Sequence, residues 1–229
     1  MRHLDPIQAN LREKALWLTK STGVLPAIKL SQQEDLLPFV RAMYEGGARV
    51  VEITMTTPGA LESFRALSAA FGHDMLFAAG TVLTAPAALA AISAGARIIV
   101  SPALVPEVIE TAHAYGAACY AGGFTATECL AAMRAGADMI KIFPAKLGGP
   151  SYMTNLRMVF PEANLIPSGG INRETAGQYI QCGAAAVSGS RNFFDREAVE
   201  REGLGWITVQ TAAYIRIVAE ARETAKPLP

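Results

Sequence analysis

One short pattern recurs along this chain and constrains its fold more than any other feature. A Gly-Ala pair introduces an apolar, β-rich run at five places, which are GGARVVEIT at 46–54, AGARIIVSP at 94–102, YGAACYAGG at 115–123, AGADMIKIFPA at 135–145 and CGAAAVSGS at 182–190. Glycine readily adopts the left-handed conformation that ends many helices. Alanine then permits a close approach into a buried strand. Each unit therefore predicts a helix, a short loop and a strand.

Three further apolar runs bring the predicted strands to eight, and they are GVLPAIKL at 23–30, MLFAAGTV at 75–82 and NLIPSGGI at 164–171. The segments between the runs carry apolar residues at three- and four-residue spacing, which is typical of amphipathic helices. Strict alternation of apolar strands with helices indicates a parallel sheet covered by helices. Eight repeats in about 200 residues favour a closed (β/α)8 TIM barrel. An open doubly wound sheet is the alternative, although the Gly-rich first turn of the dinucleotide-binding type is absent.

Two predicted helices lie outside the eight repeats. The first is an extra N-terminal helix over roughly residues 5–20, and the second is a last helix over roughly residues 207–224. We expect both to flank or cap the barrel or to form part of an interface. No Pro/Gly/Ser-rich linker or low-complexity tract interrupts the chain, so residues 1–229 are predicted to form a single barrel domain.

The composition excludes several classes of protein. With 51% hydrophobic and 17% charged residues, the chain differs from disordered segments. Twenty basic and twenty acidic side chains cancel, which argues against a nucleic-acid or membrane-surface partner. The first residues lack the apolar stretch of a signal peptide, and no run of 18 apolar residues follows. The three cysteines form no C-x-x-C pair, so we expect a soluble protein of the reducing cytoplasm.

Charged residues occur near the ends of the second and sixth predicted strands. In VVEITMT the period of two places Glu52, Thr54 and Thr56 on one face, and in MIKIFPA it turns Lys141 and Phe143 toward the barrel axis. The active sites of such barrels lie at the C-terminal ends of the strands. One interpretation is a buried structural ion pair. The other is a lysine that forms a Schiff base with a carbonyl substrate while the glutamate transfers protons.

Glycine- and serine-rich turns follow the last two predicted strands. Ser168-Gly169-Gly170 follows the seventh strand and Ser188-Gly189-Ser190 follows the eighth. Barrel enzymes commonly bind phosphate at these two strand ends through backbone N–H groups, and glycine permits close approach of the anion. Plain βα turns are the alternative, because glycine is common in turns.

Six motifs between residues 23 and 192 occur in a characteristic order, namely VVEITMT, AAGTV, IVSPAL, KIFPAK, PSGGIN and SGS. In this order and spacing the chain resembles the 2-keto-3-deoxy-6-phosphogluconate aldolase family, which overlaps with the 2-keto-4-hydroxyglutarate aldolases. The resemblance implies a trimeric class I aldolase on a (β/α)8 barrel that cleaves 2-keto-4-hydroxy acids to pyruvate and an aldehyde. It also implies that Lys141 is the Schiff-base lysine, Glu52 the general acid/base, Thr81 a ligand of the pyruvate carboxylate and Phe143 a stacking residue.

The chain departs from the family pattern at the carboxylate site. Many members carry an arginine in the strand-two motif L-R-T, whereas this chain has Thr56 there. Other members carry a basic residue at the end of strand one, which is the position of Lys29. Lys29 shares a predicted face with Ala27, so it is either the carboxylate cation or a solvated strand-end lysine.

These observations predict a cytoplasmic class I aldolase, working as a homotrimer without metal or other cofactor, whose partner is a small 2-keto acid, phosphorylated at its far end. The predicted catalytic residues are Lys141 and Glu52. The predicted substrate-binding residues are Lys29, Thr56, Thr81, Phe143, Ser168, Gly169, Gly170, Gly189 and Ser190. The alternatives are a phosphate-binding barrel epimerase or synthase, in which Lys141 only hydrogen-bonds the substrate, and a non-catalytic sugar-phosphate binding protein.

Overall fold

The computed structural model describes residues 6–72 and 74–225, and it arranges eight parallel strands in the order β7-β6-β5-β4-β3-β2-β1-β8. The strands are β1 (Val24–Ile28), β2 (Val50–Thr54), β3 (Leu76–Gly80), β4 (Ile98–Val100), β5 (Ala118–Gly123), β6 (Met139–Ile142), β7 (Leu165–Pro167) and β8 (Val187–Gly189). A bridge between Ser168 and Ser188 joins the two ends of the sheet. The predicted (β/α)8 barrel is therefore confirmed.

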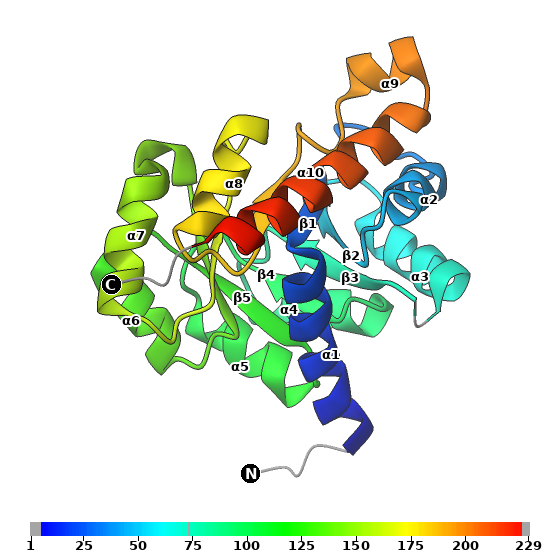
Figure 1. Cartoon of the computed structure of the whole chain (residues 1–229). Helices are drawn as coiled ribbons and strands as arrows, with labels where there is room; N and C mark the ends of the chain where they lie inside the picture. The colour runs from blue at the N-terminus through cyan, green and yellow to red at the C-terminus, as the bar shows by residue number, and fades with distance from the viewer. Residues whose placement is uncertain (1–5, 73, 226–229) are drawn as a thin grey trace.

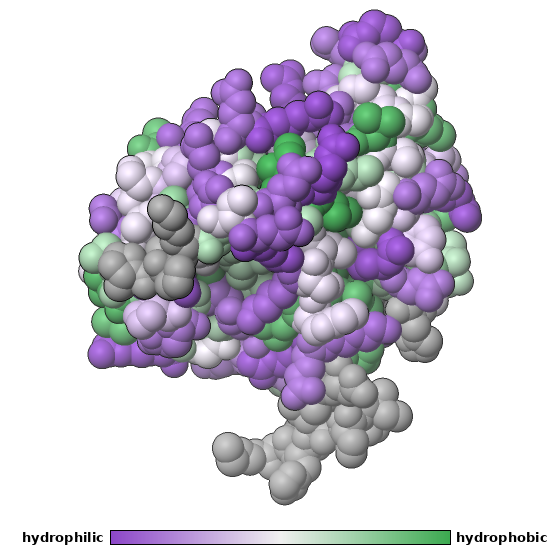
Figure 2. All heavy atoms as spheres, in the orientation of Figure 1, coloured by the Kyte–Doolittle hydropathy of each residue, from purple (hydrophilic) through white to green (hydrophobic). Residues whose placement is uncertain are grey.

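Helices surround the strands, as Figure 1 shows. They are α1 (Pro6–Thr22), α2 (Leu37–Glu45), α3 (Ala60–Phe71), α4 (Ala85–Ala94), α5 (Pro106–Ala114), α6 (Ala126–Arg134), α7 (Gly149–Val159), α8 (Arg173–Gln181), α9 (Arg196–Glu202) and α10 (Gly205–Thr224), with a short 3-10 helix η1 (Ala145–Leu147) before α7. The predicted first and last helices correspond to α1 and α10. Helix α9 is additional: it protrudes beside the start of α10 (Figure 1), and its surface is strongly hydrophilic (Figure 2). No helix in the described ranges has both the length and the apolar character needed to cross a membrane.

The recurring Gly-Ala pair ends five helices in the same way. Each glycine has a positive φ, between 73° and 120°, and the following alanine N–H donates to the carbonyl five residues earlier at 2.8–3.1 Å. This is the Schellman arrangement, in which a left-handed residue allows the last turn of a helix to bond back on itself. The residue pairs are Gly47-Ala48, Gly95-Ala96, Gly116-Ala117, Gly136-Ala137 and Gly183-Ala184.

Side chains along the strands alternate between two packed layers. Val51, Ile53, Ile140 and Ile142 belong to the layer between the sheet and the helices. A second apolar cluster fills the barrel interior and consists of Leu25, Val50, Leu76, Ala78, Ile98, Val100, Ala118, Tyr120, Met139, Ile166 and Ala186 with Ala15 and Leu18 of α1.

Helix α1 covers the N-terminal end of the barrel. Ala15 and Leu18 pack into the interior cluster, and the hydroxyls of Thr19 and Tyr120 are 2.8 Å apart. Arg12 pairs with Asp138 at 2.6 Å, just before β6 begins. Because this end of the barrel is covered, a ligand must reach the interior from the C-terminal ends of the strands.

Asp138 fixes α1 to the barrel through a buried network. Its carboxylate accepts hydrogen bonds from Arg12 (2.7 Å) and the backbone N–H of Cys119 (2.8 Å), and it lies 3.0 Å from the His113 ring nitrogen. Burial alone would raise the pKa of Asp138, but these partners outweigh burial and hold the pKa below its ordinary value. Asp138 is therefore ionised at neutral pH, when it can pair with Arg12.

Candidate active site

Lys141 and Glu52 meet inside the barrel. Each is the third residue of its strand, β6 and β2 respectively. The Lys141 amine donates to the two carboxylate oxygens of Glu52 at 3.3 and 3.4 Å. Only 8% of Lys141 and 2% of Glu52 is exposed. The structure thus brings the two predicted catalytic side chains into one buried, hydrogen-bonded pair.

Gly80 makes room for this pair at the end of β3, where sequence reasoning assigned no role to it. A Cβ atom at this position would lie 2.1 Å from the Glu52 Oε1 atom and 2.7 Å from its carboxyl carbon. A Cβ atom does not approach nonbonded atoms this closely, so any side chain at this position would displace the carboxylate. In the sequence, Gly80 directly precedes Thr81 in the A-A-G-T-V motif.

Gly80→Ala is expected to lower the rate of pyruvate methyl-proton exchange by about 10²-fold, because a displacement of roughly 1 Å at a reacting group has an effect of that size. Exchange into deuterated water, followed by NMR, measures the rate. Gly123→Ala at the end of β5 is the matched control, since its Cβ would meet its neighbours at 3.4 Å or more. An unchanged rate in folded Gly80→Ala would show that the position of the Glu52 carboxylate is not critical.

Thr81 and Phe143 lie beyond the ends of β3 and β6. Thr81 has φ = +60° and is the one non-glycine residue with positive φ among residues 6–72 and 74–225. Such strained backbone concentrates at functional positions. Phe143 is 42% exposed, and its ring edge lies 3.0 Å from the position that a Cβ of Gly169 would occupy. The ring therefore packs on the turn after β7 and leaves part of its surface open to a ligand.

Thr56 lies in the turn after β2 with its side chain exposed. Its hydroxyl donates to the Thr54 Oγ1 atom at 3.1 Å, and Thr54 and Thr57 are joined at the same distance. The backbone N–H of Leu30 donates to the Thr57 hydroxyl at 3.2 Å. This chain of hydroxyls links the ends of β2 and β1, and the sequence interpretation missed the part played by the buried Thr57.

The turns after β7 and β8 lie next to one another. The hydroxyls of Ser168 and Ser188 are both buried and lie 3.5 Å apart. Gly169 and Gly170 have φ values of 86° and 83°, which disfavour any side chain there. Gly189 and Ser190 follow, both partly exposed. The two predicted phosphate-binding turns are thus adjacent, and the residues that form them are glycine or serine.

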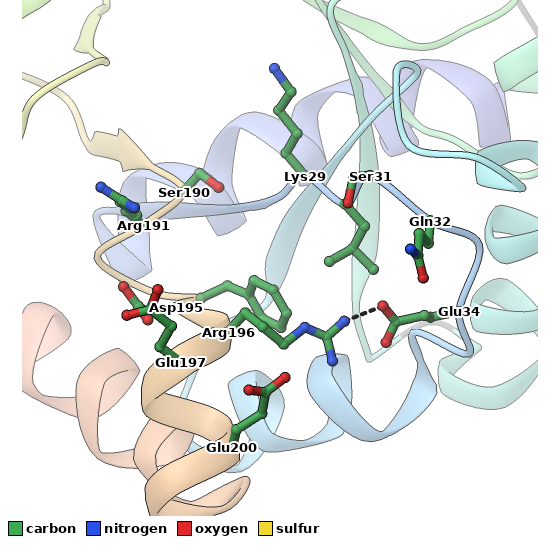
Figure 3. Close-up of a pocket in the computed structure, with 12 residues that line it drawn as sticks. Lys29, Ser31, Gln32, Glu34, Ser190, Arg191, Asp195, Arg196, Glu197 and Glu200 are labelled. Atoms are coloured by element: carbon green, nitrogen blue, oxygen red, sulfur yellow. Dashed lines mark hydrogen bonds and ion pairs between the residues drawn. The ribbon is translucent and has the colours of Figure 1, made fainter.

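Lys29 directly follows the last residue of β1 and is exposed. It lines a pocket of about 670 Å³ between the β1–α2 segment and the β8–α9 segment (Figure 3). Ser190 and Arg191 line the same pocket, and an ion pair between Glu34 and Arg196 connects its two sides. In Figure 3 the amine of Lys29 points away from this ion pair. Neither Lys141 nor Glu52 lines this pocket.

No group of three or more potential metal ligands occurs in the part of the chain that the structure describes. His113 contacts Asp138 at the opposite end of the barrel, and His3 and His73 lie outside the described residues.

Comparisons with known proteins agree with this geometry. The family model "Aldolase: KDPG and KHG aldolase" matches residues 17–209. The chain is 34% identical to the 2-dehydro-3-deoxy-6-phosphogalactonate aldolase of Escherichia coli, over 90% of this chain and 98% of that protein. It is 31% identical to the 2-dehydro-3-deoxy-phosphogluconate aldolase of Treponema pallidum, over 85% of this chain and 93% of the relative.

A solved structure with a similar fold contains a reaction intermediate. It is the KDPG aldolase of Legionella pneumophila with pyruvate captured as a covalent carbinolamine, and it superposes with a TM-score of 0.78 at 28% identity. The similarity covers 87% of this chain and 97% of that protein.

Proposed function

We propose that this chain, which belongs to the KDPG and KHG aldolase family, attacks the keto carbon of its substrate with the amine of Lys141. The chain is a class I aldolase, which reversibly cleaves a 2-keto-3-deoxy-4-hydroxy acid to pyruvate and an aldehyde through a lysine Schiff base. The observation that supports the choice of Lys141 is its buried contact with Glu52 at 3.3 Å, on the side of the barrel that a ligand can enter.

In the proposed reaction, Glu52 first accepts a proton from Lys141, which frees the amine to attack the keto carbon. Loss of water from the carbinolamine gives an iminium ion. Removal of the proton from the 4-hydroxyl lets the bond between C3 and C4 break, and the electron pair of that bond moves into the iminium to form an enamine. The aldehyde leaves, C3 is protonated, and hydrolysis releases pyruvate. Glu52 contacts the Lys141 nitrogen directly, and we assign each of these proton transfers to its carboxylate.

The pyruvate carboxylate is assigned to Lys29, Thr81 and Thr56. A carboxylate that leaves water needs donors or a cation, and a threonine hydroxyl supplies a hydrogen bond without charge. Lys29 supplies the charge from the end of β1, which the hydroxyl chain through Thr57 connects to the end of β2. Phe143 is proposed to stack on the bound acid with the exposed part of its ring.

Lys29→Met should raise the KM for pyruvate exchange by about 10- to 100-fold with little change in kcat, which is the effect of one charge-assisted hydrogen bond. NMR exchange over a range of pyruvate concentrations gives both constants. Lys20→Met, on α1 at the covered end of the barrel, is the control. An unchanged KM would assign the carboxylate to neutral donors.

The two turns after β7 and β8 are proposed to bind a phosphate at the far end of the substrate. We therefore expect kcat/KM for 2-keto-3-deoxy-6-phosphogluconate to exceed that for 4-hydroxy-2-oxoglutarate by about 10-fold or more, since hydrogen bonds to a charged group are the stronger ones. A pyruvate-release assay across phosphorylated and unphosphorylated 2-keto-3-deoxy acids measures the ratio. Equal values would remove phosphate recognition from the proposal.

We also propose that the enzyme works in the cytoplasm as a homotrimer and needs no cofactor. The three cysteines, odd in number and without a C-x-x-C pair, support the compartment, and the family resemblance supports the assembly. Sedimentation velocity measures the oligomeric state directly.

A further inference from the structure

Two cationic side chains flank the turns after β7 and β8, and the reaction described above uses neither. Lys146 belongs to η1, and its backbone N–H donates to the Gly169 carbonyl at 3.0 Å. A Cβ atom on Gly170 would lie 2.5 Å from the Lys146 Cβ and 2.8 Å from its Cδ. The aliphatic stem of Lys146 therefore packs on Gly170, while the residue as a whole is exposed.

The second cation is Arg191, which lies in the turn after β8. It follows Ser190 directly, is exposed, and lines the same pocket as Ser190 and Lys29. In the view of Figure 3, Ser190 lies between the side chains of Arg191 and Lys29. Arg191 is thus next to the second turn in the chain, whereas Lys146 packs on the first turn from η1.

The two turns are held together by backbone and side-chain contacts. Ser168 and Ser188 are paired as a β-bridge, and their hydroxyls are 3.5 Å apart. Beyond them, the side-chain amide of Asn192 donates to the Ile171 carbonyl. Asn192 follows Arg191, and Ile171 follows Gly170. This contact therefore joins the segments that carry the two cations.

Neither cation has an ion-pair partner among residues 6–72 and 74–225. Among the described residues, no carboxylate lies within 4.0 Å of the Lys146 amine or the Arg191 guanidinium, whereas nearby Arg196 pairs with Glu34. The nearest acidic group along the chain, Asp195, accepts a hydrogen bond from the Ala198 N–H at the start of α9. Glu197 and Glu200 also line the pocket, from α9. Both cations are therefore available to an anion at the two turns.

We propose that Lys146 and Arg191 bind the phosphate at the far end of the substrate and determine the preference for phosphorylated over unphosphorylated 2-keto acids. This inference rests on the proposed function. A phosphate monoester carries up to two charges, which backbone N–H groups at the glycine turns only partly balance. A lysine adds a point charge and an arginine adds two parallel donors, so the pair recognises a dianion more strongly than a neutral hydroxyl.

Lys146→Gln and Arg191→Gln test the inference separately and together. Each single variant should raise the KM for 2-keto-3-deoxy-6-phosphogluconate about 10-fold, and the double variant should raise it further. The KM for unphosphorylated 2-keto-3-deoxygluconate and the exchange of pyruvate protons should change less than about twofold. Lys20→Gln and Arg65→Gln are matched controls far from the turns, on α1 and α3.

Calorimetric titration with inorganic phosphate gives a readout that does not depend on turnover. The Kd for phosphate should rise about 10-fold in each variant and remain unchanged in both controls. An unchanged phosphate Kd in the double variant, or an equal loss with phosphorylated and unphosphorylated substrates, would overturn the inference. If wild-type protein neither cleaves these acids nor exchanges pyruvate protons, the proposed function fails, and the phosphate titration still decides whether the two cations bind an anion.

Discussion

Replacement of Lys141 by methionine is expected to abolish aldol cleavage and the covalent capture of pyruvate together. Methionine keeps most of the length and apolar character of the lysine stem but has no amine, so no Schiff base can form. We expect kcat/KM to fall by about 10⁵-fold, because removal of the nucleophile of a covalent mechanism leaves the other groups of the site with no intermediate to act on. Borohydride reduction in the presence of pyruvate, followed by peptide mass mapping, should find one adduct on Lys141 in wild-type protein and none in the variant.

Two controls make this result specific. Lys29→Met retains Lys141 and should still give the adduct at a high pyruvate concentration. Removing Lys141 also leaves the Glu52 carboxylate, which is 2% exposed, without its cation, and an unpaired buried charge is strongly destabilising. Circular dichroism must therefore show that the variant is folded. An adduct on another lysine in folded, active Lys141→Met would transfer the role of nucleophile to that residue.

The sequence predicted the barrel and the position of the Lys141–Glu52 pair because both depend on local periodicity. The five Gly-Ala pairs end helices in one way, and the period of two within β2 and β6 sets which side chains face inward. Neither pattern predicts the distance between Lys141 and Glu52, which are 89 residues apart in the sequence. That distance depends on the stagger of the closed sheet and on the space left at Gly80, both of which are tertiary properties.

Residues beyond the strand ends were harder to place. β1 ends at Ile28 and β2 ends at Thr54, so the period of two no longer applies to Lys29 or Thr56, and both side chains are exposed. Helix α9 was missed because its seven residues offer a single buried side chain, Ala198, and therefore no apolar stripe. The sequence places Arg191 directly after Ser190 but assigns it no role, and Lys146 gave no signal because its relation to Gly170 arises from a contact between separate segments.

Glu52→Gln should separate nucleophile from proton relay. The amide keeps the shape of the carboxylate and an oxygen that can accept a hydrogen bond from the Lys141 amine, but it cannot take up a proton. Covalent trapping of pyruvate should therefore survive, although more slowly, while exchange of the pyruvate methyl protons falls by about 10²- to 10⁴-fold.

Gly80→Ala tests the same group by displacement, so its exchange rate should lie between wild type and Glu52→Gln. Glu62→Gln on the exposed face of α3 removes a carboxylate without touching the site and should leave exchange unchanged. Near-normal exchange in Glu52→Gln would mean that another group moves the protons and that the buried pair only positions Lys141. A loss of trapping as complete as the loss of exchange would instead mean that Glu52 is needed to free the amine, which would place its main role before the carbon–carbon bond breaks.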